Sequence, residues 1–218
     1  IADGDWSSDV CSSDLFFSDK QNAIIELKSK NVHIDNVLDL KHNGRSVISW
    51  SLNTTAVQKS EEAHATSIDD RLAAATEVQK AGYKLGFHFD PMIDHAEWRE
   101  GYRETVDKIF KAINPENIAW ISLGALRYPA PFEDVMRQNH PESKIFLGEL
   151  VPGIDKKLRY FQPIRIEMFR NMHKWIRSYS REVFIYLCME SKVVWQKAFG
   201  WTPKSSAELK RLLDDRVR

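Results

Sequence analysis

The chain has 218 residues, of which 43% are hydrophobic and 28% charged, a composition typical of a water-soluble globular protein with a sizeable core. Lys and Arg number 31, as do Asp and Glu, so the net charge is zero, which argues against a strongly basic nucleic-acid binder and an acidic disordered chain. Two cysteines cannot build a disulfide framework, and no apolar run reaches the roughly 20 residues of a membrane span. We therefore expect a cytoplasmic protein that does not contact a membrane.

The first 15 residues differ in character from the rest of the chain. The sequence starts at Ile1 rather than Met, and residues 5–15 (DWSSDVCSSDL) show no apolar period. This peptide resembles the translation of a sequencing adapter, and we set it aside as one would an expression scar. We expect residues 1–15 to be an artefactual or disordered leader, in which Cys11 has no function, so that Cys188 is the only native thiol.

Strand-like and helix-like segments alternate from residue 16 onward. A helix is well marked after residue 66, because Ser67 and Asp70 have the spacing of an N-terminal cap and Gly82 follows its end. In chain order, the first half predicts a strand over 23–29, a helical turn over 35–40, a strand over 45–53, a helix over 67–80, a strand over 83–90 and a helix over 97–113.

The alternation continues through the second half of the chain. It predicts a strand over 118–123, a helix over 132–138, a helix from Pro163 to 179, a strand over 183–189, a helix over 191–199 and a last helix capped by Ser205 or Ser206. Residues 142–162 show no clear strand, and a connection of that length often marks a binding insert. The pattern indicates an α/β fold, a partial β/α barrel over 16–204 with an insert at 142–162, then a C-terminal helix and tail over 205–218.

Each predicted strand has one apolar face and one polar face, because successive side chains of a strand point to opposite sides. The polar side chains gather toward the carboxyl ends of the strands, where the active sites of barrels and open sheets lie. Charged groups buried there would be costly unless paired or hydrated, so we interpret them as a ligand-binding mouth rather than a chance hydrogen-bonded network. The residues concerned are Lys28, Ser49, Ser51, Asn53, His88, Asp90 and Glu190.

Two further patterns leave alternatives open. His88 and Asp90, with Asp94 and His95 nearby, could place two metal ligands on one face, but the spacing fixes no third ligand, so no metal site is predicted. The second pattern is a basic and aromatic cluster, which is either a solvated loop or a surface for a nucleic-acid backbone with an aromatic ring able to stack or wedge. Its members are Lys156, Lys157, Arg159, Tyr160, Phe161 and Arg165.

Four segments resemble one known family in their order and spacing. They are 39–45 (DLKHNGR), 49–53 (SWSLN), 81–87 (AGYKLGF) and 147–165 (LGELVPGIDKKLRYFQPIR). Together they resemble the spore photoproduct lyase family of radical S-adenosylmethionine (SAM) proteins over about residues 20–200. The resemblance implies a partial (β/α)6 barrel, a [4Fe–4S] cluster bound by a CxxxCxxC motif, reductive cleavage of SAM and repair of thymine dimers in DNA.

The resemblance also assigns roles to individual residues. The family's SAM-contacting serine falls on Ser51 and its lysine on Lys28, whose hydroxyl and ammonium groups suit the ribose and carboxylate of SAM. The family's DNA-facing hairpin falls on Arg159 and Tyr160, and Arg127 stands in another substrate-side segment. No catalytic residue is assigned. The cofactor site is expected to be completed by Asn53, His88, Asp90 and Glu190.

The CxxxCxxC motif does not occur in the sequence, whose cysteines are Cys11 and Cys188. Three thiolates are needed to hold such a cluster with SAM on the fourth iron. We therefore expect the C-terminal part of a radical SAM enzyme, with the N-terminal barrel units and the cluster ligands missing, and without activity as it stands. Its expected partners are SAM and DNA, and a monomer is favoured.

Two other functions fit the residues when they are considered alone. One is a metal-dependent hydrolase on a β/α barrel that uses His88, Asp90 and Glu190; zinc or manganese uptake abolished by His88→Ala would favour it. The other is a non-catalytic DNA-binding module acting through residues 156–165. Salt-sensitive DNA binding that Arg159→Ala weakens would favour this second function.

Overall fold

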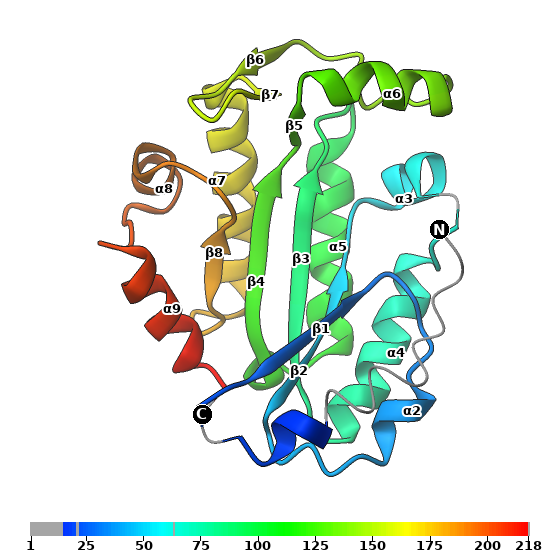
Figure 1. The fold of residues 1–218 in the computed structure, drawn as a ribbon, viewed down its shortest axis with the longest axis vertical. Helices are drawn as coiled ribbons and strands as arrows, with labels where there is room; N and C mark the ends of the chain where they lie inside the picture. Colours follow the sequence, from blue (N-terminus) through cyan, green and yellow to red (C-terminus); the bar gives the residue numbers. More distant parts are fainter. Residues whose placement is uncertain (1–14, 21, 63, 218) are drawn as a thin grey trace.

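The computed structural model describes residues 15–20, 22–62 and 64–217, and the leader predicted over 1–15 lies almost entirely outside them. A parallel sheet of five strands in the order β1-β2-β3-β4-β8 forms the centre of the molecule (Figure 1). The predicted α/β fold class and its five main strands are thus confirmed. The strands are β1 (Ile25–Ser29), β2 (Ser46–Ser51), β3 (Lys84–Met92), β4 (Ile118–Ala125) and β8 (Ile185–Leu187).

Three long helices, α4 (Ile68–Lys80), α5 (Trp98–Ala112) and α7 (Gln162–Tyr179), cover one face of this sheet and lie behind it in Figure 1. The apolar strand faces pack against them, which buries large side chains such as Phe87 and Phe169 completely. The hydroxyl of Ser67 accepts a hydrogen bond from the Asp70 backbone N–H at 3.1 Å, so the predicted cap of α4 is confirmed. Further helices are α2 (Asp35–Leu38), α3 (Thr55–Glu61), α6 (Pro131–Asn139), α8 (Lys192–Phe199) and α9 (Ser206–Asp214), together with the short 3-10 helix η1 (Pro115–Asn117).

The opposite face of the sheet is covered only in part. Near the amino ends of the strands, Leu212 and Leu213 of α9 pack against Val47, Trp120 and Phe184. Among the described residues, Figure 1 shows no helix over the carboxyl-terminal half of this face. Within the described ranges, no helix is long and apolar enough to cross a membrane.

A second, antiparallel sheet was missed by the sequence analysis. It has three strands in the order β5-β7-β6, namely β5 (Arg127–Pro129), β7 (Lys157–Tyr160) and β6 (Leu150–Pro152). The expectation of no strand over 142–162 is therefore wrong, because strands of three or four residues are too short to show an alternating pattern. The turn of the β6–β7 hairpin closes through a hydrogen bond from Gly153 N to Lys157 O at 2.8 Å.

Two smaller differences concern the ends of elements. The strand expected to stop at Pro91 continues to Met92, since β3 pairs with β4 up to the partners Met92 and Ala125. Helix α3 was not expected at all; Thr54 caps it by accepting a hydrogen bond from Val57 N at 3.1 Å.

Candidate binding chamber on the sheet

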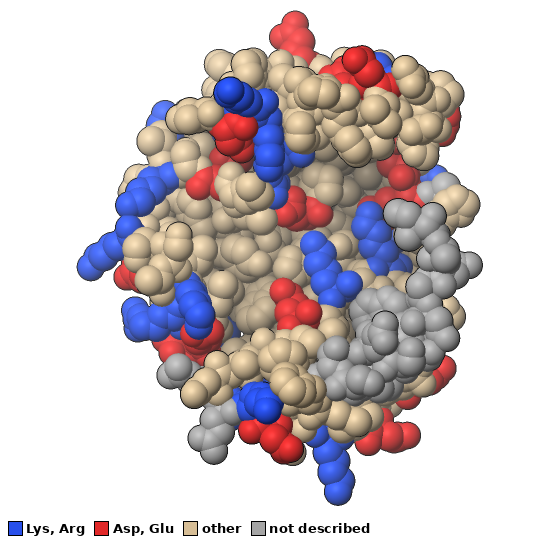
Figure 2. Space-filling view, viewed as in Figure 1, with Lys and Arg blue, Asp and Glu red and all other residues tan. Residues whose placement is uncertain are grey.

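The polar side chains of neighbouring strands meet on the sheet face that the long helices do not cover, which we call the chamber face. Parallel pairing sets them side by side: Lys28 is opposite Ser49, Ser51 is opposite His88, and His88 is opposite Ser122. Figure 2 shows this side of the molecule hollowed at its centre, with acidic and basic side chains around the hollow. The strands thus bring together residues far apart in the sequence.

Glu26 of β1 is at the centre of the polar contacts on the chamber face. Its Oε1 accepts hydrogen bonds from Ser49 Oγ at 2.6 Å, His88 Nε2 at 2.7 Å and Trp120 Nε1 at 2.9 Å. Burial acts to raise the pKa of this carboxyl, but the hydrogen bonds and the charge of His88 outweigh it and lower the pKa below its usual value. The carboxylate therefore stays ionised at neutral pH.

Gly86 makes room for this cluster. A Cβ atom at Gly86 would lie 2.3 Å from Ser49 Oγ, 2.7 Å from Trp120 Nε1 and 3.1 Å from Glu26 Oε1. Glu26 is not among the polar residues that the sequence pattern singled out. A glycine in the middle of a neighbouring buried strand, where a side chain would otherwise be expected, is the signal that could have pointed to it.

Asp90 does not stand free on the chamber face, because Arg127 of β5 forms a two-pronged ion pair with it at 2.9 and 3.1 Å. The same guanidinium donates to Cys188 Sγ at 3.4 Å and to the carbonyl of Ala125 at 3.1 Å. Burial and the neighbouring Asp90 raise the pKa of the Cys188 thiol to about 11, against the opposing charges of Arg127 and Lys28. Cys188 is therefore a protonated thiol at neutral pH.

Glu190 is likewise occupied by a partner from the protein. Arg165 donates to its two carboxylate oxygens at 2.8 and 3.3 Å, and both side chains are less than a tenth exposed. Arg165 also donates to the carbonyl of Tyr160, so it joins α7 to the segment after β8 and to the end of β7. The acidic residues expected at the mouth are thus both neutralised by arginines.

Asn53 is buried, and the protein uses its whole amide. Its Nδ2 donates to the Pro91 carbonyl at 3.0 Å, and its Oδ1 accepts from the Tyr102 hydroxyl at 2.6 Å and Thr54 N at 3.1 Å. These bonds connect the residues that follow β2 with Pro91 of β3 and with Tyr102 of α5. The predicted cofactor role of Asn53 stays a prediction, and the observed bonds give it a positioning role.

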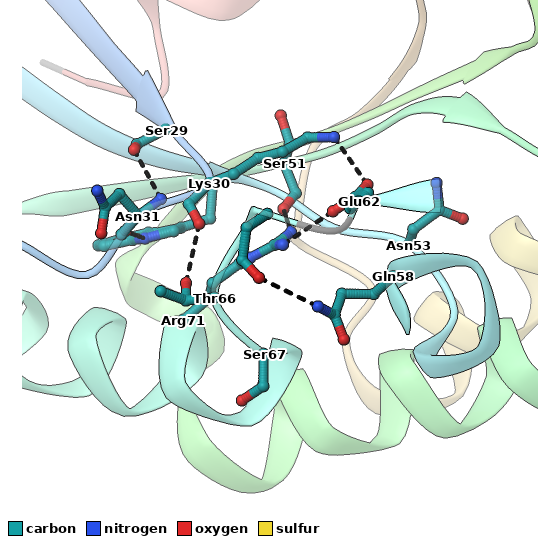
Figure 3. A network of polar contacts seen from close by, with 12 residues as sticks. Ser29, Lys30, Asn31, Ser51, Asn53, Gln58, Glu62, Thr66, Ser67 and Arg71 are labelled. Atoms are coloured by element: carbon teal, nitrogen blue, oxygen red, sulfur yellow. Dashed lines mark hydrogen bonds and ion pairs between the residues drawn. The ribbon is translucent and has the colours of Figure 1, made fainter. Parts of the chain in front are cut away.

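Ser51 and Lys28 differ from these residues, because neither side chain has a hydrogen-bond partner within the described ranges. The backbone around Ser51 is nevertheless held firmly. The fully buried Arg71 donates to the Ser51 carbonyl at 2.7 Å and pairs with Glu62 at 2.8 Å, and Glu62 pairs with Lys30 at 2.7 Å (Figure 3). A fixed backbone with a free hydroxyl is a suitable arrangement for binding a ligand.

The hairpin residues lie beyond the carboxyl ends of the main strands. Arg159 forms an ion pair with Asp155 across the hairpin turn. The Tyr160 ring is buried, and its hydroxyl accepts a hydrogen bond from Asp94 N at 3.1 Å. Ile154 at the tip is fully exposed. The predicted substrate contacts of Arg159 and Tyr160 stay predictions, since both side chains have partners inside the protein.

The residues proposed for a metal site do not converge. His88 binds Glu26, Asp90 binds Arg127 and Glu190 binds Arg165, so each is directed to a different partner. In the part of the chain that the structure describes, no group of three or more His, Cys, Asp or Glu side chains could hold a metal ion. The geometry therefore gives no support to a metal-dependent hydrolase.

A parallel sheet with a polar chamber face places the chain among the partial β/α barrels, which bind their ligands at the carboxyl ends of the strands. The model of the family described as Spore photoproduct lyase matches residues 9–162, more than half of the chain. The chain therefore belongs to the spore photoproduct lyase family, as the sequence resemblance indicated.

Curated relatives support this assignment over part of their length. The spore photoproduct lyase of Bacillus subtilis (strain 168) is 37% identical over 120 residues, which are 54% of this chain and 35% of that protein. The spore photoproduct lyase of Geobacillus sp. (strain Y412MC61) is 33% identical over 123 residues, 56% of this chain and 36% of that protein. The chain thus spans about a third of the length of these relatives.

Solved structures share the fold. A spore photoproduct lyase mutant with bound AdoMet and dinucleoside spore photoproduct has a TM-score of 0.74 and 25% identity, covering 82% of this chain and 55% of that one. Spore photoproduct lyase complexed with dinucleoside spore photoproduct matches with the same score, identity and coverage.

Proposed function

We propose that this chain supplies the SAM-binding and lesion-facing part of a radical SAM enzyme that repairs spore photoproducts in DNA. The observation that carries the proposal is the chamber face, where the hydroxyl of Ser51 and the ammonium group of Lys28 are free at the ends of adjacent strands. A structural neighbour binds AdoMet and a dinucleoside spore photoproduct. SAM, when bound with its cluster, supplies the 5′-deoxyadenosyl radical; the residues here would bind and orient it.

The iron–sulfur cluster itself does not fit the residues of this chain. The two cysteines, Cys11 and Cys188, lack the CxxxCxxC spacing, and Cys188 is protonated and bound by Arg127. We therefore expect that anaerobic reconstitution of this polypeptide with iron and sulfide yields no cluster absorbance. A stable cluster that cleaves SAM would contradict this expectation.

Binding of SAM can be measured by isothermal titration calorimetry on the chain as it stands. Replacing a group that makes a charge-assisted hydrogen bond with alanine costs about 1.5–3 kcal/mol, so Lys28→Ala should weaken binding about tenfold or more. A neutral hydrogen bond of the Ser51 hydroxyl contributes about 0.5–1.5 kcal/mol, so Ser51→Ala should weaken binding about two- to tenfold. Lys80→Ala is the matched control, because Lys80 lies on the surface in a pair with Glu77. Absence of SAM binding by the unchanged chain, or equal weakening by the control, would refute the proposal.

The DNA-facing role is proposed for the β6–β7 hairpin, supported by its lysines and its fully exposed Ile154. Binding that depends on phosphate contacts weakens as salt rises, and each lost contact reduces the slope by about one. Lys156→Ala should therefore lower both the affinity for a DNA duplex and its salt dependence. Lys210→Ala on α9, where Lys210 pairs with Asp214, serves as the control and should change neither.

A further inference from the structure

A partly enclosed cavity of about 360 Å³ lies at the base of the β6–β7 hairpin, away from the residues proposed to bind SAM. This volume is within the range of about 300–1,000 Å³ that is typical of small-molecule sites. Three segments that are distant in the sequence form its walls: the residues after β3, the connection before β6, and the end of β7 with the first turn of α7. We call it the root cavity; residues 94–95, 144–145, 147–149, 160 and 164 line it.

Apolar and aromatic side chains form much of the wall of the root cavity. Ile145 and Ile164 are half-buried there, and Leu147 is 70% exposed, so apolar surface is left in contact with water. The ring of Tyr160 is buried, and a hydrogen bond from Asp94 N to its hydroxyl at 3.1 Å fixes its orientation. A flat ligand with apolar faces would cover this surface, which makes its binding favourable.

The charged groups of the root cavity have no partners. The carboxylates of Asp94 and Glu149 and the ammonium group of Lys144 form no hydrogen bond or ion pair with any residue that the structure describes; Asp94 and Lys144 bond only through their backbone N–H groups, to Tyr160 and Glu61. Partial burial raises the pKa of the Asp94 carboxyl above its usual value, so this group has lost part of its hydration. It is therefore an acceptor available to a ligand.

The mixed charges indicate which ligand group fits. Lys144 disfavours a cationic group, and the two carboxylates disfavour a phosphate or a carboxylate. A neutral flat molecule remains, with two adjacent N–H donors for a carboxylate and an acceptor for an ammonium group. Among the bases of DNA, guanine has this edge, since its N1–H and 2-amino group lie side by side next to O6. The other three bases place an acceptor beside their donor, which a carboxylate repels.

The position of the root cavity connects it with DNA. It lies at the base of the hairpin for which we propose a DNA-facing role, and Ile154 at the tip of that hairpin is fully exposed. Apolar side chains inserted between base steps unstack them. Proteins that take up an unstacked base bind it through hydrogen bonds to its Watson–Crick edge and through packing against apolar or aromatic side chains. The root cavity offers both kinds of contact.

We propose that the root cavity binds an unstacked guanine base of DNA, with Asp94 accepting hydrogen bonds from its N1–H and 2-amino groups and Lys144 donating to its O6. This inference rests on the proposed function, because the hairpin has to bring the DNA to the cavity. It gives the chain a preference for a guanine near the hairpin, in addition to the contacts with the DNA backbone.

Isoleucine methyl groups labelled with carbon-13 are local probes of this site, since Ile145 and Ile164 line the cavity. A bound purine ring should shift both methyl resonances, which Ile145→Val and Ile164→Val would assign. 2′-Deoxyguanosine should bind about tenfold more tightly than 2′-deoxyinosine, which lacks the 2-amino group and so one hydrogen bond to a charged acceptor. Asp94→Asn should bind 2′-deoxyguanosine about tenfold more weakly and lose this preference.

A single strand of thymines with one central guanine tests whether the base comes from DNA. It should bind about tenfold more tightly than the same strand with hypoxanthine in place of guanine. Lys156→Ala should weaken the binding of both strands equally, because it removes a backbone contact and not a base contact. A guanine strand that binds no more tightly than free 2′-deoxyguanosine would overturn the assignment to DNA.

The control and a second variant make the test decisive. Asp214→Asn, which removes a surface carboxylate paired with Lys210, should change neither affinity nor preference. Gly148→Phe retains Asp94 but places a ring toward Tyr160 inside the cavity, so it should abolish the methyl shifts. If SAM and DNA bind, but the preference for guanine is absent or survives in Asp94→Asn, the inference is overturned and the proposed function stands. If neither SAM nor DNA binds the unchanged chain, both are overturned.

Discussion

Substituting Gly86 with alanine tests whether the Glu26 cluster is built as described. The new Cβ would lie 2.3 Å from Ser49 Oγ and 2.7 Å from Trp120 Nε1, so these side chains must move. Forcing an extra methyl group into a packed site costs about 1–3 kcal/mol, and losing a hydrogen bond to the Glu26 carboxylate costs about 1.5–3 kcal/mol. Since alanine also restricts the unfolded chain, which offsets about 0.4–1 kcal/mol, we expect a net loss of about 2–4 kcal/mol.

The free energy of unfolding can be measured by urea denaturation followed by circular dichroism. A loss of that size corresponds to a fall in melting temperature of about 5–15 °C for a protein of this length. Gly148→Ala is the matched control, because a Cβ there would meet only Tyr160 Cε1 at an ordinary 3.9 Å, and it should change stability by less than about 0.5 kcal/mol.

A double variant makes the test specific. Ser49→Ala removes the atom closest to the new methyl group, so Gly86→Ala combined with Ser49→Ala should be more stable than the sum of the two single changes predicts. Two results would refute the reasoning. One is a Gly86→Ala protein as stable as Gly148→Ala, and the other is strict additivity in the double variant.

Three further predictions concern other polar contacts and use the same urea measurement. Arg71→Met should lower the free energy of unfolding by about 3–5 kcal/mol, because it leaves the carboxylate of Glu62 partly unpaired. A decrease below 1 kcal/mol would contradict this. Tyr102→Phe should cost about 1–3 kcal/mol, since the buried hydroxyl bonds both Ile93 N and Asn53 Oδ1; an unchanged midpoint would count against it. The pKa of Glu26 is lower in the folded chain than the usual carboxyl pKa of 4.5, so its ionised form adds stability above pH 4.5. This added stability is lost as the pH falls through the folded-state pKa. The stability advantage over Glu26→Gln should therefore shrink below about pH 4.5, and a constant difference down to pH 3 would be inconsistent with it.

The main sheet could be predicted because its physical signals are local. Apolar and polar residues alternate from Ile48 to Ser51 in β2, and Ser67 marks the start of α4 within one turn. The parallel pairing then follows from the alternation of strands and helices. The β6–β7 hairpin could not be predicted in this way, since its strands have three and four residues and both include exposed or half-exposed side chains.

The candidate site could be predicted only as a face, and the individual partners could not. Alternation placed His88, Asp90 and Ser51 on one side of the sheet, and the structure agrees. The sequence does not reveal which acid meets which base, because Arg127 reaches Asp90 from a strand that was not expected. Asn53 shows the same limit, since the Pro91 carbonyl that accepts from its amide lies 38 residues further along the chain.

Arg127 also attaches the small antiparallel sheet to the main sheet. Its guanidinium fastens the first strand of that sheet to Asp90 and Cys188, and Arg165 ties the last residue of β7 to Glu190. Because it is anchored at each side, we expect the hairpin to be rigid. A macromolecule that binds at Ile154 would contact a preformed surface, so little conformational entropy would be lost on binding.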